Sequence, residues 1–337
     1  MVRLKDIAQL VGVSVMTVSK ALRDEPDVSA ATKARIKKLA QDMGYVPDSS
    51  AQGLRTKTTK LFGLVIPSTT NPIYARIVYA IEERAFELGY DLIISHTLNK
   101  PEREEACLRR LLSRRVDGLF ITPVYRFEAE ARIYQEIAAR KIPTVLLGPP
   151  APFCRNFPAI EIEELVASYN VTKHFLSLGH KKIAYLTGPP AAPWAHERFE
   201  GYRRALREAG QEVDDKLVFH SGATIEDGIK AALQLLNEGC QPTAIQAVND
   251  LVAIGCAETL FNQGIKIPEE ISIAGFGNVL TAEHYRVPLT TVRQPKHRLG
   301  VAAIEKMLKL MRGEPVDIKR LPAELEIRKS SAPPKKT

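Results

Sequence analysis

The stretch VSVMTVSKAL, residues 13–22, governs how the N-terminal part of the chain folds. Val18, Ala21 and Leu22 recur at helical spacing, so they face one side of a short helix. Ser14 stands directly before that helix, where a serine hydroxyl can cap the first turn. The other side chains of the stretch are left for the helix surface.

One short helix is expected before this stretch and another after it. Residues 4–12, LKDIAQLVG, place apolar residues at helical spacing and end in Gly12, a residue type that commonly terminates helices. Ser29 can cap the third helix, which ends at Gly44. The apolar stripe of the third helix consists of Ile36, Leu39, Ala40 and Met43. Three short helices, with a tight glycine-containing turn between the first two, predict a helix-turn-helix.

In a helix-turn-helix, the N-terminal residues of the second helix meet base edges in the major groove. Lys20 can donate to guanine O6 and N7, and Val15 and Met16 can contact thymine methyl groups. Thr17 occupies the same end of the helix. We expect phosphate contacts from Ser14, Ser19 and Lys33. A capped surface helix with a solvated lysine is the alternative interpretation.

Residues 45–60, YVPDSSAQGLRTKTTK, are polar and end in a group of cations. A linker explains this composition. The segment from Ser49 to Leu54 is alternatively one or two helical turns that fold only on a surface that supplies contacts, because so short a helix is unstable alone. Leu54, with Arg55 beside it, is suited to wedge into a minor-groove base step.

Composition supports a nucleic-acid partner only modestly. The 337-residue chain carries a formal charge of +8, and residues 1–60 contribute 11 basic and six acidic side chains. No signal peptide and no apolar run of about 18 residues is visible, so we expect a cytoplasmic protein without a membrane segment. The four cysteines lack metal-site spacing, and no nucleotide-binding, metalloprotease or hydrolase motif appears. The sequence therefore predicts no enzyme activity, no metal and no cofactor.

The rest of the chain alternates strand-like and helix-like segments. We expect strands at 61–67, 91–96, 118–122, 143–148, 182–188, 243–248 and 271–276. We expect helices at 75–88, 102–113, 163–178, 199–209, 226–237, 250–263 and 297–311. This alternation predicts an α/β core with two lobes, in which parallel sheets carry helices on both faces.

These segments together resemble the lactose-repressor (LacI/GalR) family of bacterial transcription factors. The motifs that carry the resemblance include LKDIAQLVGVSVMTVSKAL, RVDGLFITP, LGHKKIAYLTGP, ISIAGFGNV and LTTVRQPKHRLG, in family order along nearly the whole chain. The resemblance implies a type I periplasmic-binding-protein-like core and a homodimer whose recognition helices enter adjacent major grooves. It also implies paired hinge helices that place Leu54 in the central minor groove.

On this basis we divide the chain into four parts. The divisions are a helix-turn-helix domain (1–47), a hinge (48–60), an effector-binding and dimerisation core (61–330) and a disordered tail (331–337). Within the core, the first lobe comprises 61–160 and 291–320, and the second comprises 162–289 and 321–330.

The resemblance also implies effector-binding residues between the lobes. They are Ser68, Asn71, Tyr74 and Thr122 from the first lobe, and Trp194, Arg198 and Asn249 from the second. Asn249 has a further interpretation as a helix cap, and Trp194 as packing of a proline-rich loop. The chain departs from a typical sugar binder at Ile162, Ala192, Ala223 and Gly277, where polar, acidic or aromatic residues are usual in the family.

The sequence thus predicts a sequence-specific DNA-binding transcriptional repressor. It would bind a palindromic operator as a dimer, under control of a small-molecule effector, sugar-like or atypical, in the interlobe cleft. One alternative is a regulator with a vestigial cleft, controlled by a protein partner or by DNA alone. A distant alternative is a cytoplasmic α/β enzyme or sugar carrier with a basic head.

Overall fold

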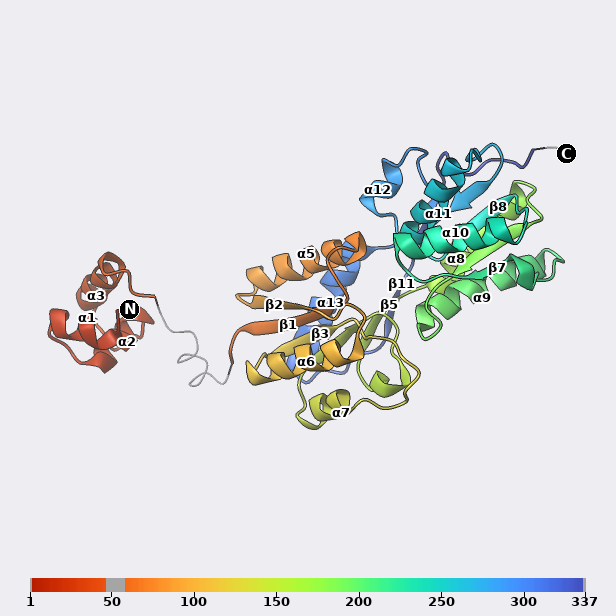
Figure 1. Cartoon of the computed structure of the whole chain (residues 1–337). Coiled ribbons are helices and arrows are strands. Elements are labelled where there is room, and N and C mark those ends of the chain that lie inside the picture. Colours follow the sequence, from red (N-terminus) through yellow and green to blue (C-terminus); the bar gives the residue numbers. More distant parts are fainter. Residues whose placement is uncertain (1, 47–57, 336–337) are drawn as a thin grey trace. The chain divides into compact units, whose positions relative to one another are not determined.

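The computed structural model describes residues 2–46 and 58–335, which form two compact units (Figure 1). The first unit, the headpiece, is Met1–Thr59, and the second, the core, is Lys60–Thr337. Leu54 and Arg55, which we expect to contact DNA, lie outside the described residues. Within the described ranges, no helix is both long and apolar enough to span a bilayer.

The headpiece consists of the three predicted helices: α1 (Leu4–Val11), α2 (Val15–Leu22) and α3 (Ala30–Asp42). Ser14 and Ser29 cap the second and third helices, because each hydroxyl accepts a hydrogen bond from a backbone amide three residues later. Gly12 takes a left-handed φ of 74°, which glycine adopts without strain and which turns the chain from α1 toward α2. The helices enclose a small apolar core of Ile7, Ala8, Val11, Val18, Ala21, Ile36 and Ala40.

The first lobe of the core is built on a six-stranded parallel sheet of order β11-β5-β4-β3-β1-β2. Its strands are β1 (Leu61–Ile66), β2 (Asp91–His96), β3 (Gly118–Ile121), β4 (Thr144–Leu147), β5 (Ala159–Ile162) and β11 (Lys319–Leu321). Its helices are α5 (Pro72–Glu87), α6 (Pro101–Ser113), α7 (Arg132–Ala139) and α13 (Lys296–Met311). One face packs against α5 and α13, and the other against α6 and α7.

The second lobe is built on a four-stranded parallel sheet of order β7-β6-β8-β9. Its strands are β6 (Ile183–Thr187), β7 (Val218–His220), β8 (Ala244–Ala247) and β9 (Ser272–Ala274). Its helices are α8 (Glu164–Ser177), α9 (Pro193–Glu208), α10 (Ile225–Asn237), α11 (Asp250–Asn262) and the short α12 (Leu280–Glu283). The helices α8 and α9 cover one face and α10 and α11 the other. The predicted architecture of parallel sheets between helices is confirmed.

One predicted lobe boundary is wrong. We expected residues 291–320 to belong to the first lobe, but β10 (Thr291–Arg293) pairs antiparallel with β12 (Glu324–Glu326). Val292 is buried in the apolar cluster under α8 and α9 of the second lobe, and Arg293 forms a bridge with Gly277. The return to the first lobe therefore begins at α13, because Val292 finds its apolar partners on the second lobe.

The predicted disorder of residues 331–337 is also wrong for the part of this tail that the structure describes. Ser330 is buried and exchanges backbone and side-chain hydrogen bonds with Ile273 of the edge strand β9. Ala332 continues this pairing, because its amide donates to Ser272 Oγ at 3.0 Å and its carbonyl accepts from the same hydroxyl. The polar composition suggested a solvated tail, but its serine and backbone groups complete the open edge of the sheet.

Candidate functional site

The first turn of α2 presents two apolar side chains to solvent. Val15 is 46% exposed and Met16 is 64% exposed, whereas the inner face of the helix is buried in the headpiece core. Ser14 holds this turn, because its Oγ accepts a hydrogen bond from Thr17 N at 3.1 Å and lies 2.8 Å from Thr17 Oγ1. Exposed apolar groups at this end of the helix suit contact with thymine methyl groups in a major groove.

Two polar candidates on α2 are held by neighbouring side chains. Lys20 Nζ donates to the Asp27 carboxylate, and this bond is the largest influence that lowers the pKa of Asp27. Ser19 Oγ accepts a hydrogen bond from Arg23 Nη1 at 2.8 Å. A DNA contact by Lys20 therefore requires exchange of the bond to Asp27 for one to a base. Asp27 was not predicted as a partner of Lys20, because it lies beyond the end of the helix.

Lys33, expected at a phosphate, is directed toward the loop before α3. Its Nζ donates to Asp24 O at 3.0 Å and lies 4.0 Å from Asp24 Oδ1. Lys37 also donates to the Asp24 carboxylate. These contacts hold the loop between α2 and α3 and leave Lys33 only partly available for phosphate.

Arg198 is the centre of a buried cluster on the second lobe. Its side chain is 5% exposed, and its Nε donates to Glu164 Oε2 at 2.7 Å. Its Nη1 donates to Val248 O at 2.6 Å. The guanidinium carbon lies 3.6 Å from the centre of the Phe276 ring and 4.7 Å from that of Trp194. Hydrogen bonds in the plane and aromatic rings against the face hold this cation in one orientation.

Tyr74, in the first turn of α5, is a first-lobe residue that the charges of this cluster reach. Burial raises the pKa of its phenol to about 12, and the charges of Arg198 and Glu164 act on the same group. Burial also raises the pKa of Glu164, against the opposing effect of Arg198. Of the predicted residues, Trp194 lies against Arg198, and the phenol of Tyr74 is within range of the Arg198 charge. Glu164 and Phe276 complete the cluster and were not among the predicted site residues.

The other predicted residues hold local structure. Asn249 caps α11 through a 2.8 Å bond from Val252 N and donates its amide to Ala223 O at 3.0 Å. Asn71 caps α5 by accepting from a backbone amide, and Ser68 accepts from the backbone amide of Thr70. Among the described residues, no hydrogen bond or ring contact joins these side chains to Arg198.

Thr122 differs from these structural residues. It follows β3 at the carboxyl edge of the first sheet and is 5% exposed. Its Oγ1 is buried and has no hydrogen-bond partner within the part of the chain that the structure describes. Buried hydroxyls are normally paired, so this group is available to a ligand or an ordered water.

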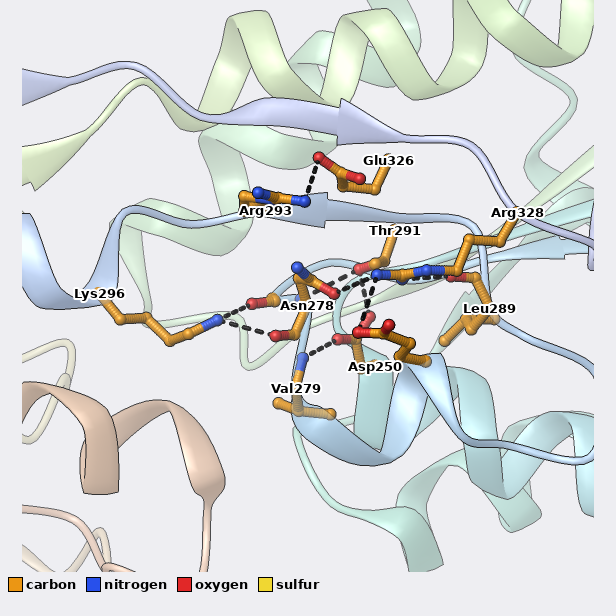
Figure 2. Close-up of polar contacts among 11 residues, drawn as sticks. Asp250, Asn278, Val279, Leu289, Thr291, Arg293, Lys296, Glu326 and Arg328 are labelled. Atoms are coloured by element: carbon orange, nitrogen blue, oxygen red, sulfur yellow. Dashed lines mark hydrogen bonds and ion pairs between the residues drawn. The ribbon is translucent and has the colours of Figure 1, made fainter.

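A further polar network surrounds the turn at Gly277 and Asn278, where the chain lacks the acidic residue usual in the resembled family (Figure 2). Asp250 supports the turn, accepting from Val279 N at 2.9 Å and from Thr291 Oγ1 at 2.5 Å. Lys296, at the start of α13, donates to the carbonyls of Gly277 at 2.6 Å and Asn278 at 2.8 Å. Lys296 was not predicted as a site residue, because its partners are backbone atoms distant in the sequence.

Comparison with known proteins gives consistent matches. The model described as "Bacterial regulatory proteins, lacI family" matches residues 3–48, and a "Periplasmic binding protein-like domain" matches residues 172–331. The chain is 32% identical to the transcriptional regulator DegA of Bacillus subtilis, with 97% of each chain covered. It is also 32% identical to the ribose operon repressor of Escherichia coli K12, with 91% of this chain and 92% of the relative covered. A structure of the lac repressor dimer bound to operator and an anti-inducer superimposes with a TM-score of 0.86, at 28% identity and with 98% and 99% of the two chains covered.

Proposed function

Since this chain belongs to the lacI family of bacterial regulatory proteins and is a DNA-binding transcriptional regulator, we propose that it represses transcription from a palindromic operator as a homodimer. A small molecule bound between the two lobes of the core would control it. The relatives are transcriptional regulators, and we assign no enzyme activity to this chain.

The exposed first turn of α2 is the observation that carries the DNA-reading part of this proposal. The exposed apolar side chains of Val15 and Met16 do not contribute to the headpiece core. Ser14 caps the helix turn that carries them. Lys20 lies one turn further along and can exchange Asp27 for a guanine. We assign base contacts to Val15, Met16 and Lys20, and phosphate contacts to Ser14, Ser19 and Lys33. Thr17 occupies the same DNA-facing end of the helix as Val15 and Met16. Leu54 and Arg55 remain our candidates for the central minor groove.

The effector part of the proposal rests on the cluster at Arg198. Trp194 of the second lobe lies against this guanidinium, and Tyr74 of the first lobe is within range of its charge. Thr122 supplies a buried hydroxyl that has no partner among the described residues. A molecule that bound more tightly to one relative arrangement of the lobes would shift the population toward it. That shift would change how the two headpieces of the dimer are spaced, and therefore the affinity for operator DNA.

A second candidate is a regulator whose cleft no longer takes an effector. The side-chain amide of Asn249 already donates one hydrogen bond and accepts another within the protein. Two nitrogens of Arg198, Nε and Nη1, likewise donate to protein acceptors. Such a protein would be controlled by a partner or by DNA alone. A thermal-shift screen of metabolites against the full chain separates the two candidates. Only the regulator controlled by an effector predicts that some compound raises the Tm.

The test of the DNA-reading function is selection of bound duplexes from a random library, followed by sequencing. We expect a palindrome of two half-sites. The Lys20→Ala variant should lose about 1–3 kcal/mol of binding free energy and relax one base position in each half-site. Recovery of duplexes without a palindrome, or of none, contradicts the proposed function.

A further inference from the structure

Lys296 is a first-lobe residue that reaches the second lobe. It begins α13, a helix that packs on α5 and on the six-stranded sheet. Its side chain extends to the turn between β9 and α12, where Nζ donates to the carbonyls of Gly277 and Asn278 (Figure 2). The amino group therefore lies at the boundary between the lobes.

The turn that receives Lys296 is held rigidly. Gly277 and Asn278 both take positive φ angles, 138° and 50°. Arg328 donates to Asn278 Oδ1 at 2.8 Å, and Asn278 N donates to Thr291 Oγ1 at 3.2 Å. These contacts hold the turn that carries the two carbonyls. The hydrogen bonds from Lys296 Nζ to both carbonyls therefore position its ammonium group.

The ammonium group has neutral acceptors and no carboxylate partner within the part of the chain described. The carboxylate that acts on it most strongly is Asp250, whose oxygens already accept from Val279 N and Thr291 Oγ1. Arg76 and Arg293 add positive charge nearby. Burial and these cations lower the pKa of Lys296 to about 8. Charges removed from water are normally paired, and an unpaired one marks a candidate binding group.

Lys296 is connected to the cluster at Arg198 through the first turn of α5. A Cβ atom placed on Gly277 would lie 3.1 Å from Ile73 Cδ1, so Ile73 is directly beside the turn that Lys296 contacts. The next residue, Tyr74, is the one that feels the charges of Arg198 and Glu164. Position 277 is glycine and supplies no carboxylate, and Arg76 and Arg293 add positive charge near Lys296.

We propose that Lys296 is an effector-binding residue, and that the effector is a small polar molecule with an anionic group, a carboxylate or a phosphate. This inference rests on the proposed control by a small molecule. The third N–H of Lys296 is the donor for that group, and the anion supplies the counter-charge that the protein does not provide. A neutral sugar would leave this requirement unmet.

The test compares matched pairs of ligands that differ in one anionic group. Calorimetry and thermal shift on the full-length protein would use glucose against gluconate and glucose 6-phosphate, and ribose against ribose 5-phosphate, at equal ionic strength. We expect at least one anionic member to bind roughly ten-fold or more tightly than its neutral partner, a difference of about 1.4 kcal/mol. Lys296→Met should abolish this preference, and Lys296→Arg should retain much of it.

Lys309→Met is the matched control, because Lys309 lies exposed near the other end of the same helix. Equal binding of neutral and anionic partners, an unchanged preference in Lys296→Met, or no stabilisation by any anionic compound overturns the inference. Operator binding is measured on the same samples. A protein that binds its operator but shows no anionic preference contradicts this inference alone, whereas loss of operator binding contradicts the proposed function.

Discussion

At the scale of single residues, Asp27 competes with DNA for Lys20. Asp27→Asn replaces the charged acceptor that holds Lys20 with a neutral amide oxygen, and so removes a negative charge from the headpiece. An exposed ion pair is weak, so we expect DNA affinity to rise by a factor of at most about five. Fluorescence anisotropy with a selected operator duplex measures the change.

Asp42→Asn is the control for Asp27→Asn. Asp42 ends α3, is exposed and makes no ion pair within the described residues. Equal gains in both variants would mean that net charge alone is responsible. A gain confined to Asp27→Asn, greatest on sequences with guanine in the half-site, would identify Lys20 as a base-reading residue.

Glu164 is the residue on which the orientation of Arg198 depends. Glu164→Gln leaves the Arg198 guanidinium buried without its counter-charge, and breaking a buried pair in this way costs about 3–5 kcal/mol. Chemical denaturation of the full chain should show the loss as a lower midpoint for the core. Glu163→Gln, a change at the adjacent and less buried position, should leave the midpoint nearly unchanged. A small effect of Glu164→Gln would mean that water or another group replaces the carboxylate.

Local residue roles could be predicted from the sequence, whereas roles set by distant partners could not. The caps at Ser14 and Ser29 are confirmed, because a serine before an amphipathic run needs only its own helix. The pair of Glu164 with Arg198 joins two helices, and Lys296 binds carbonyls of another lobe. Neither of these contacts can be predicted from the spacing of residues or from composition.

At the scale of elements, long and strongly patterned segments were predicted well and short ones were missed. The helix at α9 begins at Pro193 and not at the predicted 199. Its proline-rich start suggested a loop. Proline is nevertheless favoured in the first turn of a helix, because backbone N–H groups there make no hydrogen bond within the helix. The strands β7, β10 and β12 have three residues each, too few to show an alternation of apolar and polar residues in the sequence.

The segment after β12 tests whether the tail is a structural element. A chain ending at residue 329 loses four hydrogen bonds of Ser330, with Thr290 N, Ile273 O, Ile273 N and Pro288 O. At about 1 kcal/mol per bond, we expect the free energy of unfolding of the core to fall by roughly 4 kcal/mol. Differential scanning calorimetry measures the accompanying drop in Tm.

A chain ending at residue 334 is the control for this truncation. It keeps the pairing of residues 330–332 with β9, so its Tm should equal that of the full chain. If the two truncations behave alike, the hydrogen bonds of Ser330 contribute little to stability.

At the scale of the whole core, Lys296 makes stability depend on pH. Its folded-state pKa of about 8 lies below the ordinary value of 10.5, so the unfolded chain binds more protons between these values. Stability therefore rises with pH across that window. Asp250 opposes the shift, while Arg76 and Arg293 reinforce the effect of burial.

The measurement is the difference in free energy of unfolding between the wild type and Lys296→Met at pH 7.5 and pH 10. We expect the wild type to gain stability relative to the variant as the pH increases, since groups that titrate in both proteins cancel. A difference that does not vary with pH would show that Lys296 has an ordinary pKa in the folded protein.

The route of the chain through the two lobes has a consequence for biosynthesis. The first sheet has β11 at its edge beside β5, and α13 covers one of its faces, yet both are made after all four strands of the second-lobe sheet. On the ribosome, the second-lobe sheet has all four strands once residue 274 has emerged, whereas the first must wait for residue 321. Because domains fold as their chains are completed, we expect the four-stranded sheet of the second lobe to form before the six-stranded sheet of the first, whose early strands need protection from aggregation meanwhile.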